Sequence, residues 1–473
     1  MKYWIAILFF LVADIAISQG EVGYLFEDMP EDTLPNAAIN LHTSLKPYIR
    51  QANSNAEGKS YIKVAGLGDL QYFQNQTSGY KTGLGVEVAT NVKDKFYVRL
   101  AGVEGINQTG SFYSPSVYQK DSINQFLLYT DVRGRLSYTP NHIFNFQIGL
   151  DKNFLGEGCR SLLLSDYSAP YPFGMIRMRF WRIEYSLLYQ FLREWDNNRW
   201  EGKFAASHHL SFNAAKWLNM GVFETVIFQP KDTLLNRGFD VEYLNPLVFY
   251  RPQEYSLGSS DNVLIGVELN AKWKEHQFYS QFILDEFYLA EIKAKSGWWA
   301  SKYGGQVGFK GRFHKKSNHH FFYRLEYNFV RPYTYAHLSE ELNYGTQGFS
   351  LAHPYGSNFM EILGEGKWQH NKMYVKVFAN YFMRSLDKDG FNYGNDPYLP
   401  YINRPYEYGH YIGQGKQYNG VKAIITLGYK VLKHGNLQAF VENHINNTTL
   451  DNATRYTVVV GLRCMLWNDY RNY

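Results

Sequence analysis

Hydrophobic and polar residues alternate one by one through many stretches of this chain. Between Phe144 and Asp151, Phe, Ile and Leu alternate with Asn, Gln, Gly and Asp, and similar alternation runs through 321–329 and 421–431. A period of two residues is typical of a β-strand with one apolar and one polar face. These stretches are roughly nine to thirteen residues long, which suits tilted transmembrane strands better than the shorter strands of soluble sandwiches.

The connections between these stretches fall into short polar turns and long irregular segments. Short turns lie at 91–95, 274–276 and 370–372, among others. The long segments are 107–123, 153–171, 229–261, 288–302, 332–356 and 386–416. Short turns on the periplasmic rim and long loops on the extracellular rim are the layout of a bacterial outer-membrane barrel. The pattern therefore predicts an all-β fold, a transmembrane antiparallel β-barrel.

The barrel is expected to have about eighteen strands, an even number that puts both of its ends in the periplasm. The hairpin at Trp181-Arg182 carries the weakest turn signal, because no Gly, Asn or Pro marks it. The strands are predicted at 61–74, 80–92, 94–106, 124–138, 142–152, 172–180, 183–192, 203–213, 217–228, 262–273, 277–287, 303–313, 319–331, 357–369, 373–385, 417–431, 436–447 and 454–467.

The N-terminus has the features of an export signal. Lys2 gives a positive start, residues 3–16 are mostly apolar, and Ala16-Ile17-Ser18 offers small residues for cleavage. The apolar run is too short to span a bilayer comfortably. We therefore predict a signal peptide at 1–18, a short periplasmic segment at 19–60 and the barrel at 61–473. The expected location is the outer membrane of a Gram-negative bacterium.

Composition agrees with an exported barrel. The chain has 40 Tyr, 33 Phe and 40 Gly but only 15 Pro. Trp residues beyond the signal lie beside predicted turns or in loops and avoid strand centres, as in the aromatic belts of such barrels. The net charge of +5 is small, and no dense basic run suggests nucleic-acid binding. Cys159 and Cys464 fall near opposite ends of the predicted barrel, so a disulfide between them is not expected.

The predicted inner faces of the strands carry both signs of charge, for example Glu87 with Arg99 and Arg324 with Glu326. One dominant sign would suit a selective pore, whereas mixed charges can cross-link into a closed network. Any polar lumen also needs such residues for solvation, so charge alone does not separate an open barrel from a plugged one.

Five segments carry a family resemblance. They are 151–173 (DKNFLGEGCRSLLLSDYSAPYPF), the run from Asn236 to Arg251, Gly258-Ser259-Ser260-Asp261-Asn262, Leu284-Asp285-Glu286-Phe287 and Gly297-Trp298-Trp299. Together they resemble the Wzi-type capsule-assembly family of outer-membrane barrels, in the style of its Bacteroidota branch. The resemblance implies a lumen occluded by inward-folded extracellular loops. It also implies a non-catalytic protein that binds or organises capsular polysaccharide at the cell surface, with envelope assembly or gliding-motility proteins as further partners besides the membrane lipid.

Two groups of loop residues are candidate site residues. Tyr and Trp offer saccharides a flat apolar face with a polar handle, and Arg pairs with acidic groups. The candidate glycan-binding residues are Arg160, Tyr167, Arg251, Trp298, Trp299, Tyr393, Tyr398, Tyr401, Arg404 and Tyr406. The candidate plug or lumen residues are Asp151, Asp166, Glu242, Asp285 and Glu286. For the motifs shared with the family, a structural role in the plug is favoured over ligand contact, because buried charges are usually paired.

Catalysis, metal binding and a cofactor are not expected. The sequence has no G-x-S-x-G or H-E-x-x-H motif. The adjacent histidines of His208-His209 and His319-His320 point to opposite faces of a strand, so neither pair is preformed for chelation. The alternative function is that of a porin-like barrel or an accessory barrel for export or gliding motility.

Overall fold

The structure is a computed structural model of the chain. It describes residues 22–23, 42, 45–46, 48–49, 60–75, 78–93, 95–108, 118–123, 126–196, 199–231, 238–245, 261–315, 319–431 and 437–464. The predicted signal peptide at 1–18, most of 19–60 and the candidate residue Arg251 lie outside the described residues.

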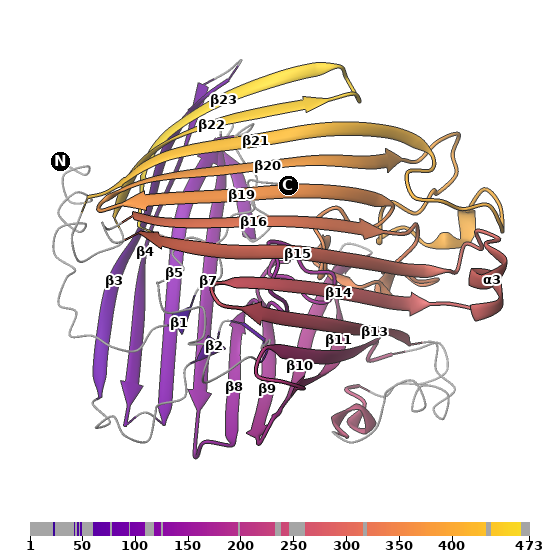
Figure 1. Cartoon of the computed structure of the whole chain (residues 1–473), viewed down its shortest axis with the longest axis horizontal. Helices are drawn as coiled ribbons and strands as arrows, with labels where there is room; N and C mark the ends of the chain where they lie inside the picture. The colour runs from indigo at the N-terminus through magenta and orange to yellow at the C-terminus, as the bar shows by residue number, and fades with distance from the viewer. Residues whose placement is uncertain are drawn as a thin grey trace.

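Eighteen antiparallel strands close into a barrel, in which β23 pairs with β3 (Figure 1). The strands of its two walls run in crossing directions in this view, as strands tilted to the barrel axis must. The wall strands are β3 (Tyr61–Gln74), β4 (Ser78–Val92), β5 (Phe96–Gln108), β7 (Phe126–Tyr138), β8 (Phe144–Asp151), β9 (Tyr171–Phe180), β10 (Ile183–Asp196), β11 (Arg199–Asn213), β12 (Leu218–Phe228), β13 (Asn262–Trp273), β14 (His276–Glu286), β15 (Lys302–Lys315), β16 (His319–Val330), β19 (Phe359–His370), β20 (Met373–Leu386), β21 (Lys416–Lys430), β22 (Gln438–Thr448) and β23 (Ala453–Arg463).

The predicted strands are confirmed, with shifts at their ends. The largest shifts include β10, which ends at Asp196 rather than 192, and β11, which begins at Arg199 rather than 203. Several short elements inside the connections were not predicted. They are β6 (Tyr118–Ile123), which pairs with β7, the hairpin of β17 (Gly345–Thr346) and β18 (Phe349–Ser350), the helix α3 (Leu289–Ala294), and the single turns η1 (Val241–Leu244), η2 (Glu340–Leu342) and η3 (Tyr401–Asn403).

The helical segments are all short. Within the described ranges, no helix has both the length and the apolar character needed to cross a bilayer.

The two faces of the wall differ as the alternation predicts. On β16, Leu325 is 61% exposed on the outside, whereas Arg324 and Glu326 are 3% and 2% exposed on the inside. On β8, Ile148 points outward and Gln147 is buried within. Apolar residues therefore face the lipid, and polar residues face the lumen.

Exposed tryptophans mark both rims of the wall. Trp181 and Trp273 lie at turns on the periplasmic rim, and Trp195 and Trp200 lie at the extracellular ends of β10 and β11. Such belts are found at the two membrane interfaces of outer-membrane barrels. The tryptophan positions thus place the wall strands across the apolar layer.

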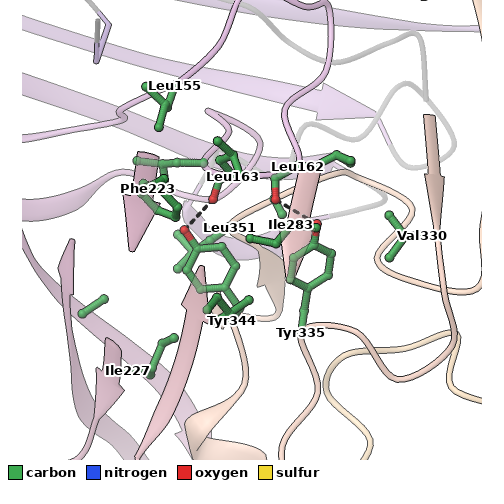
Figure 2. Close-up of a cluster of buried hydrophobic side chains, with 14 of the residues drawn as sticks. Leu155, Leu162, Leu163, Phe223, Ile227, Ile283, Val330, Tyr335, Tyr344 and Leu351 are labelled. Carbon is green, nitrogen blue, oxygen red and sulfur yellow. Dashed lines mark hydrogen bonds between the residues drawn. The ribbon is translucent and has the colours of Figure 1, made fainter. Parts of the chain in front are cut away.

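The main hydrophobic core lies inside the barrel rather than between separate layers. The loop 152–170 between β8 and β9, called here the plug, folds into the lumen, where Leu155, Leu162 and Leu163 are fully buried. These side chains meet the inward-facing Phe223 and Ile283 of the wall (Figure 2). In the described structure, an extracellular loop is therefore folded into the lumen, as the resemblance implies.

The lipid-facing position of Leu325 gives a first prediction. Leu325→Arg is expected to destabilise the folded barrel by about 2–4 kcal/mol, because an Arg near the bilayer midplane is poorly solvated. The measurement is the free energy of unfolding of the barrel in lipid vesicles.

Leu338 is the matched control, because it is 53% exposed but lies in an extracellular loop. Leu338→Arg is expected to change the same free energy by less than about 0.5 kcal/mol. Equal effects of the two substitutions would contradict the assigned orientation of β16.

Candidate functional site

The plug is anchored to the opposite wall by a buried ion pair. The Arg160 guanidinium lies 3.4 Å from Glu361 Oε1 on β19, and both side chains are 0% exposed. The same carboxylate accepts a hydrogen bond from Asn380 Nδ2 at 2.6 Å and lies 2.9 Å from His353 Nε2. Every oxygen of Glu361 therefore has a partner, which a buried charge requires.

Burial and charge act in opposite directions on these groups. Burial alone lowers the pKa of Arg160, but the attraction of Glu361 outweighs burial and holds that pKa above its ordinary value. Burial lowers the pKa of His353 to about 4, so its imidazole is neutral at pH 7. The anchor is thus a cation and an anion, with a neutral histidine beside them.

Wall side chains also bind the backbone of the plug. Glu326 of β16 accepts hydrogen bonds from the amides of Cys159 at 2.7 Å and Arg160 at 3.2 Å. Gln281 of β14 accepts from the amide of Leu162 at 2.9 Å and donates to the carbonyl of Leu155 at 3.1 Å. These bonds take the place of the strand-to-strand backbone hydrogen bonds that an irregular buried segment lacks. A buried backbone group without a partner would cost free energy.

The extracellular side of the plug is covered by the loop 331–358. The hydroxyl of Tyr335 donates to the carbonyl of Leu162 at 2.8 Å, and that of Tyr344 donates to the carbonyl of Leu163 at 2.6 Å (Figure 2). The amide of Ser165 donates to the carbonyl of Leu351 at 2.7 Å. The loop and the plug therefore pack together inside the barrel, toward its extracellular end.

The mixed charges of the inner wall are joined in pairs. Opposite charges meet along one strand, on neighbouring strands, or between a strand and the plug, and most of the paired side chains are nearly buried. The pairs include Arg99 with Glu87 at 2.7 Å, Arg133 with Asp131 at 2.8 Å, Lys203 with Glu194 at 3.0 Å, Lys310 with Glu157 at 2.8 Å and Arg324 with Glu365 at 2.9 Å. His209 Nε2 also lies 2.8 Å from Glu268 Oε1, two strands away.

Four of the five candidate plug or lumen residues contact the lumen or its covering loops. Asp151 pairs with Arg135 at 3.2 Å, and the carbonyl of Asp166 accepts from Lys152 Nζ at 2.9 Å. Asp285 and Glu286 follow one another at the end of β14. Asp285 accepts from the amide of Tyr335 at 2.8 Å, and Glu286 pairs with Lys302 at 3.1 Å.

Glu242 is the exception, because its side chain is exposed and takes no part in the plug. Its neighbour Tyr243 packs against Phe228, with ring centroids 4.7 Å apart. Phe228 faces outward, since the adjacent Ile227 belongs to the core inside the barrel. The segment 238–245 therefore lies against the outer side of the wall, which leaves Glu242 facing away from the lumen. The prediction for Glu242 was wrong for this reason.

The loops 287–301 and 387–415 are joined by backbone hydrogen bonds. The amide of Trp299 donates to the carbonyl of Glu407 at 3.1 Å, and the amides of Gly409 and His410 donate to the carbonyls of Ser296 and Gly297 at 2.9 and 2.8 Å. This pairing brings aromatic residues from distant parts of the sequence together on the extracellular side.

Trp299 lies at the centre of this region and contacts two flat groups, a tyrosine ring and a guanidinium. The ring centroids of Trp299 and Tyr401 are 4.4 Å apart, and the guanidinium of Arg404 lies 4.3 Å from the Trp299 ring. Arg404 also pairs with Glu407. We use the name aromatic cluster for Trp298, Trp299, Tyr333, Tyr401, Arg404, Tyr406 and His410, which ring contacts or cation–π contacts connect.

The aromatic cluster has buried and exposed members. His410 and Tyr333 are buried, with ring centroids 5.3 Å apart, and burial lowers the pKa of His410. The Tyr406 ring contacts the His410 ring, with centroids 4.5 Å apart, and Tyr406 remains 39% exposed. Tyr408 and Tyr411, in the same loop, are also exposed. The arrangement offers flat polarisable faces to a ligand outside the cell, supported by buried rings.

Five candidate glycan-binding residues belong to the aromatic cluster: Trp298, Trp299, Tyr401, Arg404 and Tyr406. Tyr393 and Tyr398 lie in the same loop but outside the cluster, and the Tyr398 hydroxyl donates to Glu194 Oε1 at 3.0 Å. Arg160 and Tyr167 lie in the buried plug, where they are 1% and 7% exposed. Arg160 is a structural residue, because Glu361 occupies its guanidinium.

The sequence-based choice of candidates missed His410 and Lys302. Lys302 Nζ lies 4.3 Å from the Tyr401 ring and pairs with Glu286. Neither residue belongs to a recognisable motif. The pairing of the loops 287–301 and 387–415 is the feature that brings them together.

The described part of the chain contains no group of three or more His, Cys, Asp or Glu side chains arranged to hold a metal ion.

Solved structures give a likeness for the fold. Wzi from Escherichia coli, described as an outer-membrane protein involved in group 1 capsule assembly and a carbohydrate-binding β-barrel, is similar with 13% identity over 84% of this chain and 83% of that chain, at a TM-score of 0.55. Acinetobacter baumannii OccAB2 has 9% identity, covers 87% of this chain and 99% of that chain, and has a TM-score of 0.46. Pseudomonas aeruginosa OprD has 9% identity, coverage of 88% and 98%, and a TM-score of 0.44.

The sequence matches no family model and no curated protein sequence. At these identities the likeness to Wzi concerns the fold. Together with the closed wall and its apolar outer face, it defines this chain as an outer-membrane β-barrel protein.

The buried pair of Arg160 and Glu361 gives a second prediction. Arg160→Met is expected to lower the free energy of opening of the plug by about 3–5 kcal/mol, because Glu361 is left as a buried unpaired charge. The measurement is hydrogen exchange at the plug amides in the folded barrel. Adding Glu361→Gln to the same protein should recover part of the loss.

The control is Arg455→Met, which removes a pair with Asp451 whose side chains are 52% and 38% exposed. Exposed pairs contribute about 0–1 kcal/mol. An Arg160→Met effect no larger than that of Arg455→Met would contradict the role of Arg160 as an anchor.

Proposed function

We propose that this protein binds or organises surface polysaccharide, of the capsular kind, at the cell surface, without catalysis. The observation that carries the proposal is the aromatic cluster on the extracellular loops, above a lumen filled by the plug. The resemblance of 151–173 and 297–299 to the Wzi-type family supports the same function. So does the description of Wzi as a carbohydrate-binding barrel.

The chemistry of the cluster suits a saccharide. Sugar rings present flat C–H faces that pack on Trp and Tyr, and their hydroxyls exchange hydrogen bonds with the polar ends of these side chains. Tyr406, Tyr408 and Tyr411 supply exposed rings, and Trp299 and Tyr401 contact each other in the same pair of loops. Rings already held by backbone pairing lose little freedom on binding, which favours affinity.

The charge of Arg404 is shared with Glu407, and its flat face lies over Trp299. Its main contribution to ligand binding is therefore a planar donor surface, which can form bidentate bonds with an acidic sugar once Glu407 moves aside. Export through a cleaved signal peptide at 1–18 and contacts with envelope assembly or motility proteins belong to this proposal.

The porin-like alternative needs an open path through the lumen. The fully buried leucines of the plug and the ion pair of Arg160 with Glu361 favour a closed barrel instead. An accessory role in export or gliding motility is compatible with polysaccharide binding, since the bound polymer then links the barrel to the moving or exported surface layer.

Polysaccharide binding gives a third prediction. Purified barrel in detergent should bind extracted surface polysaccharide of the host in a saturable manner. Tyr406→Ala combined with Tyr408→Ala should weaken binding about two- to ten-fold for each ring that packs on a sugar. Isothermal titration or surface plasmon resonance gives the affinity.

Tyr456→Ala is the matched control, because Tyr456 is 62% exposed on the outside of β23. Its removal should leave the affinity unchanged. Loss of binding in neither variant, or equal loss in both, would overturn the assignment of the aromatic cluster.

Conductance gives a fourth prediction and separates the two functions. The intact protein should pass no steady ion current in planar bilayers, because the plug fills the lumen. Removal of residues 154–164 should create a measurable conductance. A steady current through the intact protein, without binding to the polysaccharide, would favour the porin-like alternative.

A further inference from the structure

Part of the chain before the barrel lies inside the lumen. The described residues His42, Leu45 and Lys46, within the segment predicted to be periplasmic, contact side chains of the inner wall or the plug. His42 Nδ1 lies 2.8 Å from Ser211 Oγ, and His42 Nε2 accepts from Asn213 Nδ2 at 2.9 Å. Ser211 and Asn213 belong to the periplasmic end of β11, so His42 is held at that end of the barrel.

Leu45 continues this contact toward the interior. Its side chain is buried in the same core as the plug leucines. Its carbonyl accepts a hydrogen bond from an Arg177 guanidinium nitrogen on β9 at 2.6 Å. Arg177 also lies 3.8 Å from Glu184, so the charge that binds the segment is part of the wall network.

Lys46 binds the plug directly. Its amide donates to the carbonyl of Phe154 at 2.8 Å, and the amide of Phe154 donates back to the carbonyl of Lys46 at 3.0 Å. The two residues thus form an antiparallel bridge. Lys46 Nζ donates to the carbonyl of Gly156 at 2.7 Å and lies 3.6 Å from Glu157 Oε1.

Glu157 ties this contact to the opposite wall. Its Oε2 accepts from Lys310 Nζ of β15 at 2.8 Å, and attraction to Lys310 and Lys46 overcomes burial and holds the pKa of Glu157 below its ordinary value. The periplasmic end of the plug, residues 154–157, is therefore held between Lys46 on one side and β15 on the other.

The extracellular end of the plug is hydrogen-bonded to the loop 331–358. Leu162 and Leu163, in the same loop as Phe154, accept hydrogen bonds from Tyr335 and Tyr344. The antiparallel β-bridge between Leu155 and Leu164 connects the periplasmic end of the plug to its extracellular end. A continuous run of hydrogen-bonded contacts leads from the periplasmic end of the lumen to the outside.

We propose that His42, Leu45 and Lys46 form a latch that holds the plug from the periplasmic side. Release of these three residues loosens the plug and, with it, the extracellular loop 331–358. A periplasmic component that acts on the latch therefore changes the packing of the extracellular loop 331–358. This inference goes beyond the proposed function and holds for any ligand of the outer face.

The test is hydrogen exchange of the full-length folded barrel carrying Lys46→Ala. Loss of a charge-assisted hydrogen bond is expected to speed exchange at the plug amides 154–164 by about ten-fold or more. Exchange in β3–β5, away from the latch, should not change. Lys46→Arg keeps the charge and should stay close to the unmodified protein.

A disulfide provides a second, independent variant. Residues that exchange both backbone bonds have Cα atoms about 5.5 Å apart, which is within disulfide range. A variant with Lys46→Cys and Phe154→Cys is made in a Cys159→Ser background. Its plug amides should exchange more slowly when the two new cysteines are oxidised to a disulfide than when they are reduced. Plug exchange that is unchanged by Lys46→Ala and insensitive to oxidation of the cysteine pair would overturn the latch.

Discussion

The burial of polar groups inside a closed lumen is the constraint on which the rest of the structure depends. An irregular loop can enter such a space only if each of its amides, carbonyls and charges finds a partner there. Glu326 and Gln281 bind the plug backbone, and Glu361 neutralises Arg160. Polar side chains of the inner wall therefore hold this loop in place.

The same constraint explains the mixed charges of the wall. A set of like charges would leave buried groups uncompensated, whereas alternating signs allow pairs such as Arg99 with Glu87. Paired side chains in a filled lumen are also a rigid base for the loops above. Tyr335 and Tyr344 join the plug to the loop 331–358, and Tyr333 joins that loop to the one that carries Tyr401 and Tyr406.

The wall strands were predictable because their signal is local. Alternation with a period of two fixes the inward and outward residues of a strand such as β16 without knowledge of its neighbours. Even the hairpin at Trp181 was found, although its turn has no typical residue. Trp181 adopts a φ of 51°, a conformation rare for a bulky side chain. Pairing of Phe180 with Ile183 imposes that turn from both sides.

The loops were predictable only in part, because their contacts join distant parts of the sequence. Tyrosine-rich composition pointed to Tyr401 and Tyr406, but it also pointed to Tyr398, which turns toward Glu194 of the wall. Arg160 looked equally suited to a ligand and to an internal pair, and burial decides for the pair. Glu242 was assigned to the lumen, yet packing of Tyr243 on the outer wall leaves it exposed. None of these outcomes follows from spacing along the chain.

The central claim is that a filled barrel presents the aromatic cluster to a surface polysaccharide. The most direct test is hydrogen exchange of the folded barrel with and without polysaccharide extracted from the host surface. Protection is expected only at 296–301 and 401–411, with no change at the inner wall. Protection of inner-wall strands such as β3–β5, with none at the aromatic cluster, would contradict it and indicate a ligand path through the lumen.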